Sequence, residues 1–133
     1  MKNQRTQSTA ILLAAAVFGF TVAPLHLRAE DPKIDLSGVK ITKSTLADYK
    51  KECLSCHGKD GKGKTKAGRR AKVKDLTDAK YQGSFSDGKA FVSIKEGMKN
   101  EKGKELMKAY GSKLNDDQIK ALIKFCRTFS GKK

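Results

Sequence analysis

The chain has 133 residues, and its 29 lysines and arginines against 14 aspartates and glutamates give a formal net charge of +15. This length fits one small domain and excludes an assembly of several domains. The positive charge predicts attraction to acidic partners. A merely solvated basic surface is the alternative, because the lysines are spread along the chain.

The first 29 residues have the pattern of a secretory signal peptide. Lys2 and Arg5 precede an apolar run at residues 10–20, and Ala29 offers a small residue before a cleavage site. An uncleaved membrane anchor is the alternative, but the apolar run is short for a membrane span. We therefore predict a soluble, periplasmic protein with no membrane span after cleavage, and export leaves it little access to nucleic acid.

Residues 30–42 are expected to form an extended lead-in to a helical domain at residues 43–133. The first predicted helix runs from about Thr45 to Cys53, with Thr45 as its N-cap. Tyr49 and Cys53 are four residues apart and therefore lie on one face of this helix. The helix thus ends at the edge of the predicted core.

Cys53, Cys56 and His57 form a C-x-x-C-H pattern at the end of this helix. The pattern is the signature of covalent c-type haem attachment. Each thiol forms a thioether with one haem vinyl group, and the adjacent imidazole lies under the iron as its proximal ligand. We therefore predict one covalent haem c on these three residues, with redox chemistry that side chains alone do not supply.

Three other interpretations of the pattern are weaker. A thioredoxin-like pair normally lies in a strand–helix–strand pattern, and none surrounds Cys53. A structural zinc site needs four ligands, whereas the chain has three cysteines and two histidines, with His26 in the predicted signal peptide. A plain disulfide between Cys53 and Cys56 leaves His57 unexplained.

The middle of the chain is predicted to be mostly loop, with one clear helix. Residues 58–68 are rich in glycine and lysine, which favours tight turns, and a phosphate-binding loop is the alternative. Residues 69–85 are expected to be loop, with a helix start at residues 75–78. A helix follows at about residues 87–96, with Ser86 as its N-cap.

The last helix has the clearest pattern. It begins at Asn115 or Asp116, and its apolar residues recur at steps of three and four. This stripe consists of Ile119, Leu122, Ile123, Phe125, Cys126 and Phe129. Cys126 is therefore predicted to be a core residue, with a redox or dimerisation role as the alternative. Because almost no segment alternates with a period of two, we predict an all-α fold of about three to five helices around one haem.

A second axial ligand to the iron is expected from methionine. Histidine and methionine together ligate the iron in cytochromes c, and His57 is the only histidine after the predicted signal peptide. Met98 and Met107 are the two methionines in that part of the chain. Methionine is also a common core filler, so composition alone leaves the choice between them open.

Residues 45–129 resemble the small class I monohaem cytochromes c. Tyr49 stands four positions before the first haem cysteine, the motif CLSCHGKDGKGK follows, and a helix ending in IKEG precedes a C-terminal helix led by LNDD. The family's ligand loop commonly reads Met-Pro-x-aromatic-Gly, and residues 107–111 read MKAYG. The resemblance therefore implies that Met107 is the distal ligand, and that Met98 fills a position usually taken by an ordinary apolar residue.

Three positions depart from the family pattern. Lys108 replaces the proline after the ligand methionine, which leaves the backbone φ angle there unfixed. Many family members have a proline after the haem motif whose carbonyl accepts the Nδ1–H of the proximal histidine, and this chain has none there. If His57 makes such a contact, another backbone carbonyl between residues 68 and 74 must accept its Nδ1–H. Thr45 stands where a glycine often lets the first and last helices cross closely.

The resemblance implies single-electron transfer between proteins rather than catalysis on a substrate. The protein would be a monomer that carries one electron at a time on its haem iron. Its lysines would attract acidic redox partners such as an oxidase, a reductase or a dehydrogenase. The alternatives are a haem protein that binds or senses a ligand, and a cytochrome subunit of a larger oxidoreductase. Arg69, Arg70 and Tyr81 are candidate contacts for the haem propionates.

Overall fold

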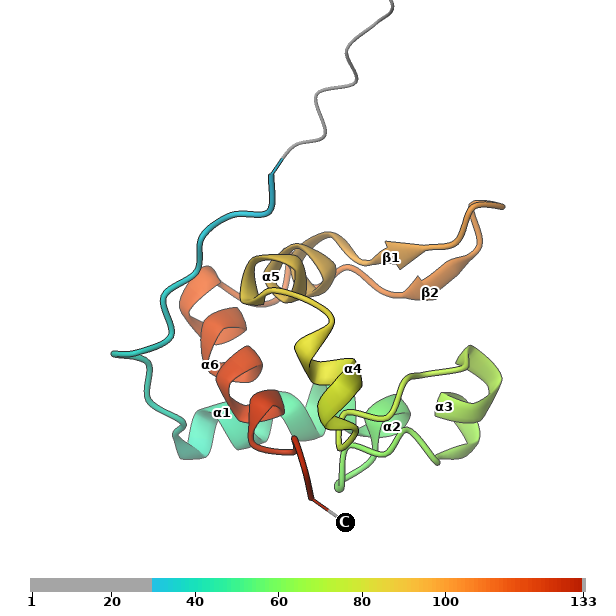
Figure 1. Ribbon diagram of the computed structural model, residues 1–133, viewed down its shortest axis with the longest axis horizontal. Coiled ribbons are helices and arrows are strands. Elements are labelled where there is room, and N and C mark those ends of the chain that lie inside the picture. The colour runs from blue at the N-terminus through green and yellow to red at the C-terminus, as the bar shows by residue number, and fades with distance from the viewer. Residues whose placement is uncertain (1–29, 133) are drawn as a thin grey trace, which may run out of the picture.

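Residues 30–132 are described by a computed structural model, and their first helical segment carries the C-x-x-C-H pattern (Figure 1). This motif segment runs through α1 (Lys43–Asp48), a π-helical turn η1 (Tyr49–Cys53) and α2 (Leu54–His57). At the end of η1, the backbone N–H of Leu54 donates to the carbonyl of Tyr49, five residues earlier. Such wide turns are frequent at functional sites, and this one ends at the first cysteine of the motif.

The N-cap of the motif segment is Thr42 rather than the predicted Thr45. The side-chain oxygen of Thr42 accepts a hydrogen bond from the backbone N–H of Thr45 at 3.4 Å, and the Thr45 hydroxyl accepts one from the backbone N–H of Thr42 at 3.1 Å. This reciprocal pair is a capping box. Threonine can cap a helix at either position, and the prediction from the sequence placed the start three residues too late. Thr45 instead lies buried inside the first turn.

Two short helices lie in the region at residues 58–85 that was predicted to be mostly loop, and the second confirms the helix start predicted within residues 75–78. Helix α3 (Lys66–Ala71) starts after its capping residue Thr65, and helix α4 (Ala79–Gly83) starts after its capping residue Asp78. Helix α3 ends at Lys72, whose backbone is left-handed with a φ of 56°. Helices of six and five residues are too short to show a hydrophobic period in the sequence.

The two longer helices lie where the sequence predicted them. Helix α5 (Asp87–Glu96) begins after its N-cap Ser86, and helix α6 (Asp116–Arg127) begins after its N-cap Asn115. Asn115 also forms a capping box with Gln118, which satisfies two backbone N–H groups at the start of α6. Helix α6 packs against both α5 and α1, so it holds these two helices in one structure.

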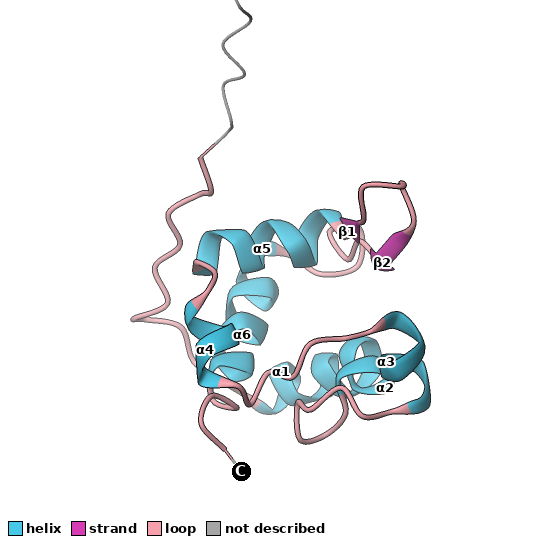
Figure 2. Cartoon of the chain, turned by 45° about the vertical axis from the view of Figure 1, so that its right-hand side comes forward, coloured by secondary structure: helices cyan, strands magenta, loops and turns pink. Residues whose placement is uncertain are grey.

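A short antiparallel hairpin lies between α5 and α6, and the sequence did not predict it. Strand β1 (Met98–Lys99) pairs with β2 (Glu105–Met107), so that Met98 lies opposite Met107. In the turn, the backbone N–H of Gly103 donates to the carbonyl of Asn100 at 2.9 Å. Strands of two and three residues are too short to show alternation. The described residues otherwise form helices and loops, which confirms the all-α prediction (Figure 2).

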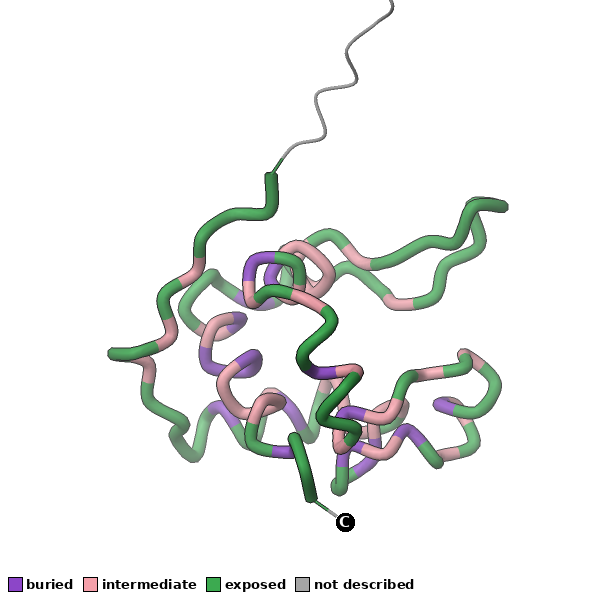
Figure 3. The backbone as a smooth tube through the Cα atoms, in the orientation of Figure 1, coloured by how far each residue is buried: buried purple, intermediate pink, exposed green. Residues whose placement is uncertain are grey.

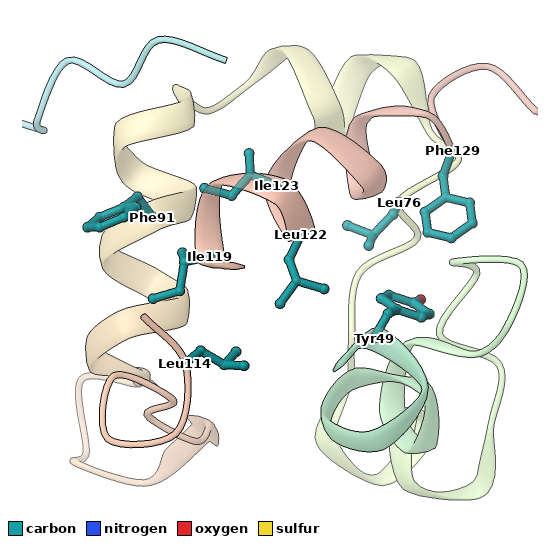
Figure 4. Close-up of a cluster of buried hydrophobic side chains, with 8 residues drawn as sticks. All are labelled: Tyr49, Leu76, Phe91, Leu114, Ile119, Leu122, Ile123 and Phe129. Carbon is teal, nitrogen blue, oxygen red and sulfur yellow. The ribbon is translucent and has the colours of Figure 1, made fainter. Parts of the chain in front are cut away.

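The hydrophobic core lies where α6 meets α5 and the motif segment, and purple buried positions concentrate there in Figure 3. Ile119, Leu122 and Ile123 of α6 are the most deeply buried large side chains, each no more than 2% exposed. Figure 4 shows Tyr49 of η1 on one side of Leu122 and Phe91 of α5 on the other. Packing on α6 therefore fixes the motif segment relative to α5.

Residues 30–42 contain no helix or strand, and they contact α5 and α6. The ammonium of Lys124 donates to the carbonyls of Leu36 and Val39 at 2.9 and 2.7 Å. The division into lead-in and domain remains a prediction, and the predicted signal peptide lies outside the described residues. Between residues 30 and 132, no helix has both the length and the apolar character needed to cross a membrane.

Candidate functional site

A cavity of about 290 Å³ lies between the motif segment, the hairpin and helices α4, α5 and α6. Apolar side chains form much of its wall. The residues on it that could carry chemistry are Cys53, His57, Met98, Met107, Cys126 and Arg127. Of the four predicted site residues, three line the cavity, namely Cys53, His57 and Met107. Cys56 is not part of the wall; it is half-buried in α2, directly before His57.

The surroundings of the His57 ring favour one of its two nitrogens as a metal ligand. Nδ1 is buried and has no hydrogen-bond partner among the described residues. The residue also lines the cavity. Burial lowers the pKa of His57 and so favours the neutral ring that a metal ion requires. With Nδ1 buried, Nε2 is the nitrogen left to bind an iron in the cavity.

No carbonyl of residues 68–74 accepts a hydrogen bond from this ring, so the contact that the sequence analysis considered for His57 is not formed. The carbonyl of Gly68 accepts instead from the backbone N–H of Val73 at 2.9 Å, at the end of α3. The carbonyl of His57 accepts from the backbone N–H of Gly63, also at 2.9 Å. His57 is thus held by its main chain and by the packing around its ring.

Helix α3 lies directly against the haem motif because Gly68 has no side chain. A β-carbon at Gly68 would lie 2.3 Å from the carbonyl oxygens of both Cys56 and Gly63. The hydroxyl of Thr65, the N-cap of α3, also donates to the carbonyl of Cys56 at 3.1 Å. The turn that carries Cys56 and His57 is therefore fixed by α3.

Both methionines of the described chain reach the cavity. Met98 and Met107 are opposite each other in the hairpin, and both line the cavity wall. Opposite residues on paired strands project to the same side of the hairpin. Met98 is 40% exposed, whereas Met107 is half-buried. The structure thus brings two thioethers to the site, of which the sequence favoured Met107.

Burial keeps two of the cysteine thiols protonated. It raises the pKa of Cys53 to about 12, with a contribution from the neighbouring Glu52 carboxylate. It also raises the pKa of Cys126 to about 12. A reactive redox pair needs the opposite shift, toward a thiolate at neutral pH. Cys126 lines the cavity from α6, in a position that suits a small apolar residue.

A polar cluster around Arg127 forms another part of the wall, and the sequence did not predict it. The guanidinium donates to the carboxylate of Asp87 at 2.8 Å, to the side chain of Gln82 at 2.8 Å and to the carbonyl of Phe85 at 3.0 Å. Gln82 is buried, and its amide donates to the carbonyl of Cys126 at 2.9 Å. The cluster ties α4, α5 and α6 together around the cavity. The sequence does show a basic residue, Arg127, in the last turn of a helix. A basic residue there also interacts favourably with the helix dipole, so its presence did not indicate a cluster.

Among the three candidate contacts for the propionates, Tyr81 lines the cavity of the described chain. Arg69 and Arg70 are exposed on α3, where Arg69 donates to the carbonyl of Lys64. They do not contribute to the cavity wall. Lys89 on α5 does contribute to it and was not a candidate.

A comparison with protein families bears directly on this site. The sequence model of the family described as cytochrome c matches residues 46–130, which include the motif segment from Leu46 onward, the hairpin and α6. This chain belongs to the cytochrome c family. The recognised family and the small helical fold therefore agree with the resemblance found in the sequence.

Two solved structures are similar to this cytochrome over 65% of its length. One is described as KustC0563 c-type cytochrome; it is 30% identical, has a TM-score of 0.58 and is covered over 96% of its chain. The other is a tyrosine-to-phenylalanine mutant of Kustc0563; it is 29% identical, has a TM-score of 0.56 and is covered over 98% of its chain. No curated protein matches this cytochrome.

The residues of the site fit the cofactor of the family, which is a covalently bound haem c. The apolar wall suits a flat apolar macrocycle, Cys53 and Cys56 have the attachment spacing, and His57 lines the cavity with its Nδ1 buried and unpartnered. Within residues 30–132, no group of three or more His, Cys, Asp or Glu side chains is arranged to hold a metal ion. A haem needs no such group, because its porphyrin supplies four of the ligands.

Proposed function

We propose that this cytochrome is an exported, soluble carrier of single electrons. Cys53 and Cys56 would attach its haem, and His57 and Met107 would ligate the iron. The observation that carries the proposal is one cavity lined by His57 from the motif segment and by Met107 from the hairpin. Figures 1 and 2 show these two elements on different sides of the fold. When bound, the haem supplies a reversible one-electron couple at its iron.

Two protein ligands on the iron suit an electron carrier. His57 is held by the hydrogen bond from Gly63 to its carbonyl and by the contact of α3 with the motif turn. Met107 belongs to a strand and is fixed by pairing with β1. Ligands held in this way stay in place in both oxidation states, so the protein rearranges little when the electron arrives or leaves.

Met107 is favoured over Met98 by its setting as well as by the family pattern. Its side chain is less exposed than that of Met98. It also begins the segment Met107–Gly111, in which the backbone N–H of Tyr110 donates to the carbonyl of Ile94 at 2.9 Å. The segment is therefore attached to α5, whereas Met98 directly follows the glycine that ends that helix.

The basic surface supports docking of acidic redox proteins. Exposed lysines follow the haem motif and surround the hairpin: Lys59, Lys64, Lys66, Lys72, Lys74, Lys99, Lys102 and Lys104. Their charge would steer an oxidase, a reductase or a dehydrogenase with an acidic face toward the haem side of a monomer. Electron transfer to such a partner in the periplasm should slow as ionic strength rises, because salt screens exposed charges.

The experiment uses the full chain, expressed with an export and haem-attachment apparatus. We expect haem that survives acid extraction, one reversible one-electron couple in a potentiometric titration, and no immediate carbon monoxide binding by the reduced protein. A Cys53→Ser/Cys56→Ser double variant should lose its haem on extraction. Haem that is extracted from the wild-type protein would contradict the covalent attachment.

Immediate carbon monoxide binding would instead support a ligand-binding or sensor protein. One observation favours this second candidate, namely the exposed Lys108 in place of the proline that follows the ligand methionine in the family pattern. A loose ligand segment would leave the sixth position of the iron open. The carbon monoxide measurement therefore separates the two functions.

A further inference from the structure

The side chain of Tyr110 joins the methionine segment to the motif segment. Its hydroxyl donates to the backbone carbonyl of Glu52 at 2.9 Å, across 58 positions of sequence. Glu52 directly precedes Cys53, and Tyr110 follows Met107 by three residues. One hydrogen bond therefore links the strand end that carries the proposed sixth ligand to the turn that carries the first attachment cysteine.

The backbone around Tyr110 is fixed independently. Its N–H donates to the carbonyl of Ile94, and the N–H of Gly111 donates to the carbonyl of Lys95, both at 2.9 Å. A β-carbon at Gly111 would lie 2.9 Å from the Lys95 carbonyl oxygen, so the chain passes close to the end of α5. The half-buried Tyr110 ring packs against the hydrophobic core. These contacts set the ring from α5, and the hydroxyl then connects it to the motif segment.

We infer that Tyr110 is a positioning residue that holds Met107 at the haem cavity, an inference that rests on the proposed ligation of the iron by Met107. The family pattern fixes this segment with a proline after the methionine, and this chain has Lys108 there. The bond from Tyr110 to Glu52 supplies a constraint from outside the segment. Lys113 adds a weaker constraint. Its ammonium lies 3.5 Å from the Glu52 carboxylate, but the Lys113 side chain is 59% exposed, so this ion pair contributes little.

A purely structural role for the Tyr110 hydroxyl makes a different prediction, and Tyr49 is the matched comparison. The Tyr49 hydroxyl also donates to a backbone carbonyl, that of Gly58, at 2.7 Å. Tyr49 is more deeply buried than Tyr110, at 4% exposure. Both partners of its bond lie at the haem motif, away from the methionine segment. Loss of the Tyr49 hydroxyl should lower global stability at least as much, without loosening Met107.

The test compares Tyr110→Phe with Tyr49→Phe in the haem-loaded protein. The readout is the rate at which carbon monoxide binds the reduced protein. Because carbon monoxide must displace Met107, this rate reports how often the methionine segment opens. Loss of one hydrogen bond predicts an increase of about fivefold for Tyr110→Phe, and Tyr49→Phe should stay close to the wild type. Adding Lys108→Pro to Tyr110→Phe should restore the slow rate, since proline fixes the backbone after Met107.

The inference is overturned if Tyr110→Phe binds carbon monoxide at the wild-type rate, or if Tyr49→Phe rises as much. The oxidised wild-type protein separates this failure from failure of the proposed function. If it lacks the weak long-wavelength absorption band of a sulfur–iron bond, the ligation by Met107 is wrong. If the band is present and the Tyr110→Phe rate is unchanged, only the role of Tyr110 is wrong.

Discussion

Replacement of Gly68 by alanine is expected to destabilise the haem motif, although alanine favours a helix more than glycine does. In a helix interior the exchange gains about 1 kcal/mol. At Gly68, however, the new β-carbon would lie 2.3 Å from the carbonyl oxygens of Cys56 and Gly63. These are backbone atoms, so α3 must move away from the motif turn. Overpacking at the upper end of its usual range costs about 3 kcal/mol, which leaves a net loss of about 2 kcal/mol in the free energy of unfolding.

Gly83→Ala is the matched control for this prediction. Gly83 lies in α4, and nothing approaches within 4 Å of an added β-carbon there. This variant should therefore be as stable as the wild type or gain roughly 0.5 kcal/mol. Urea denaturation of both haem-loaded variants, followed by far-ultraviolet circular dichroism and haem absorbance, measures the two changes. A Gly68→Ala protein that is as stable as Gly83→Ala would refute the close packing of α3 on the haem motif.

Three further predictions address the cap, the third thiol and one carboxylate. Thr42→Ala should lower the free energy of unfolding by about 1 kcal/mol because it removes the N-cap of α1, and an unchanged urea midpoint would contradict that assignment. The Cys126 thiol should resist iodoacetamide at pH 8 in the native protein, because burial raises its pKa to about 12, and it should react once urea unfolds the protein. Mass spectrometry measures the alkylation, and fast alkylation of the native protein would contradict the burial of this thiol. Hydrogen bonds from Thr77 lower the pKa of Asp75. The stability that Asp75 contributes is therefore present above its unfolded pKa and is lost as the pH falls through its lower folded value. An NMR titration should find this lowered pKa in the wild type and a higher one in Thr77→Ala.

The features that the sequence predicted are local ones. Helices α5 and α6 are long enough to show a hydrophobic stripe and a capping residue, and both begin where their caps indicated. The C-x-x-C-H pattern needs only five consecutive residues, because the predicted attachment and the proposed ligation by His57 would both occur on one turn. Burial of Ile119 follows directly from its place in the α6 stripe.

The features that the sequence missed depend on contacts between distant segments or on elements too short to have a period. The hairpin has two- and three-residue strands, and their pairing is what places Met98 beside Met107. The Arg127 cluster and the hydrogen bond from Tyr110 to Glu52 connect residues at least 40 positions apart. No spacing in the sequence reports such partners. The start of α1 was misplaced because Thr42 and Thr45 satisfy the same local capping rule.

The optical spectrum of the oxidised protein reports whether Met107 and His57 ligate the iron of a covalently bound haem. We expect the weak long-wavelength band of a sulfur–iron bond in the wild type. This band should persist in Met98→Ala and disappear in Met107→Ala. A band that survives in Met107→Ala and is lost in Met98→Ala would assign the ligand to the opposite strand of the hairpin. A wild-type protein without the band would contradict the electron-carrier account.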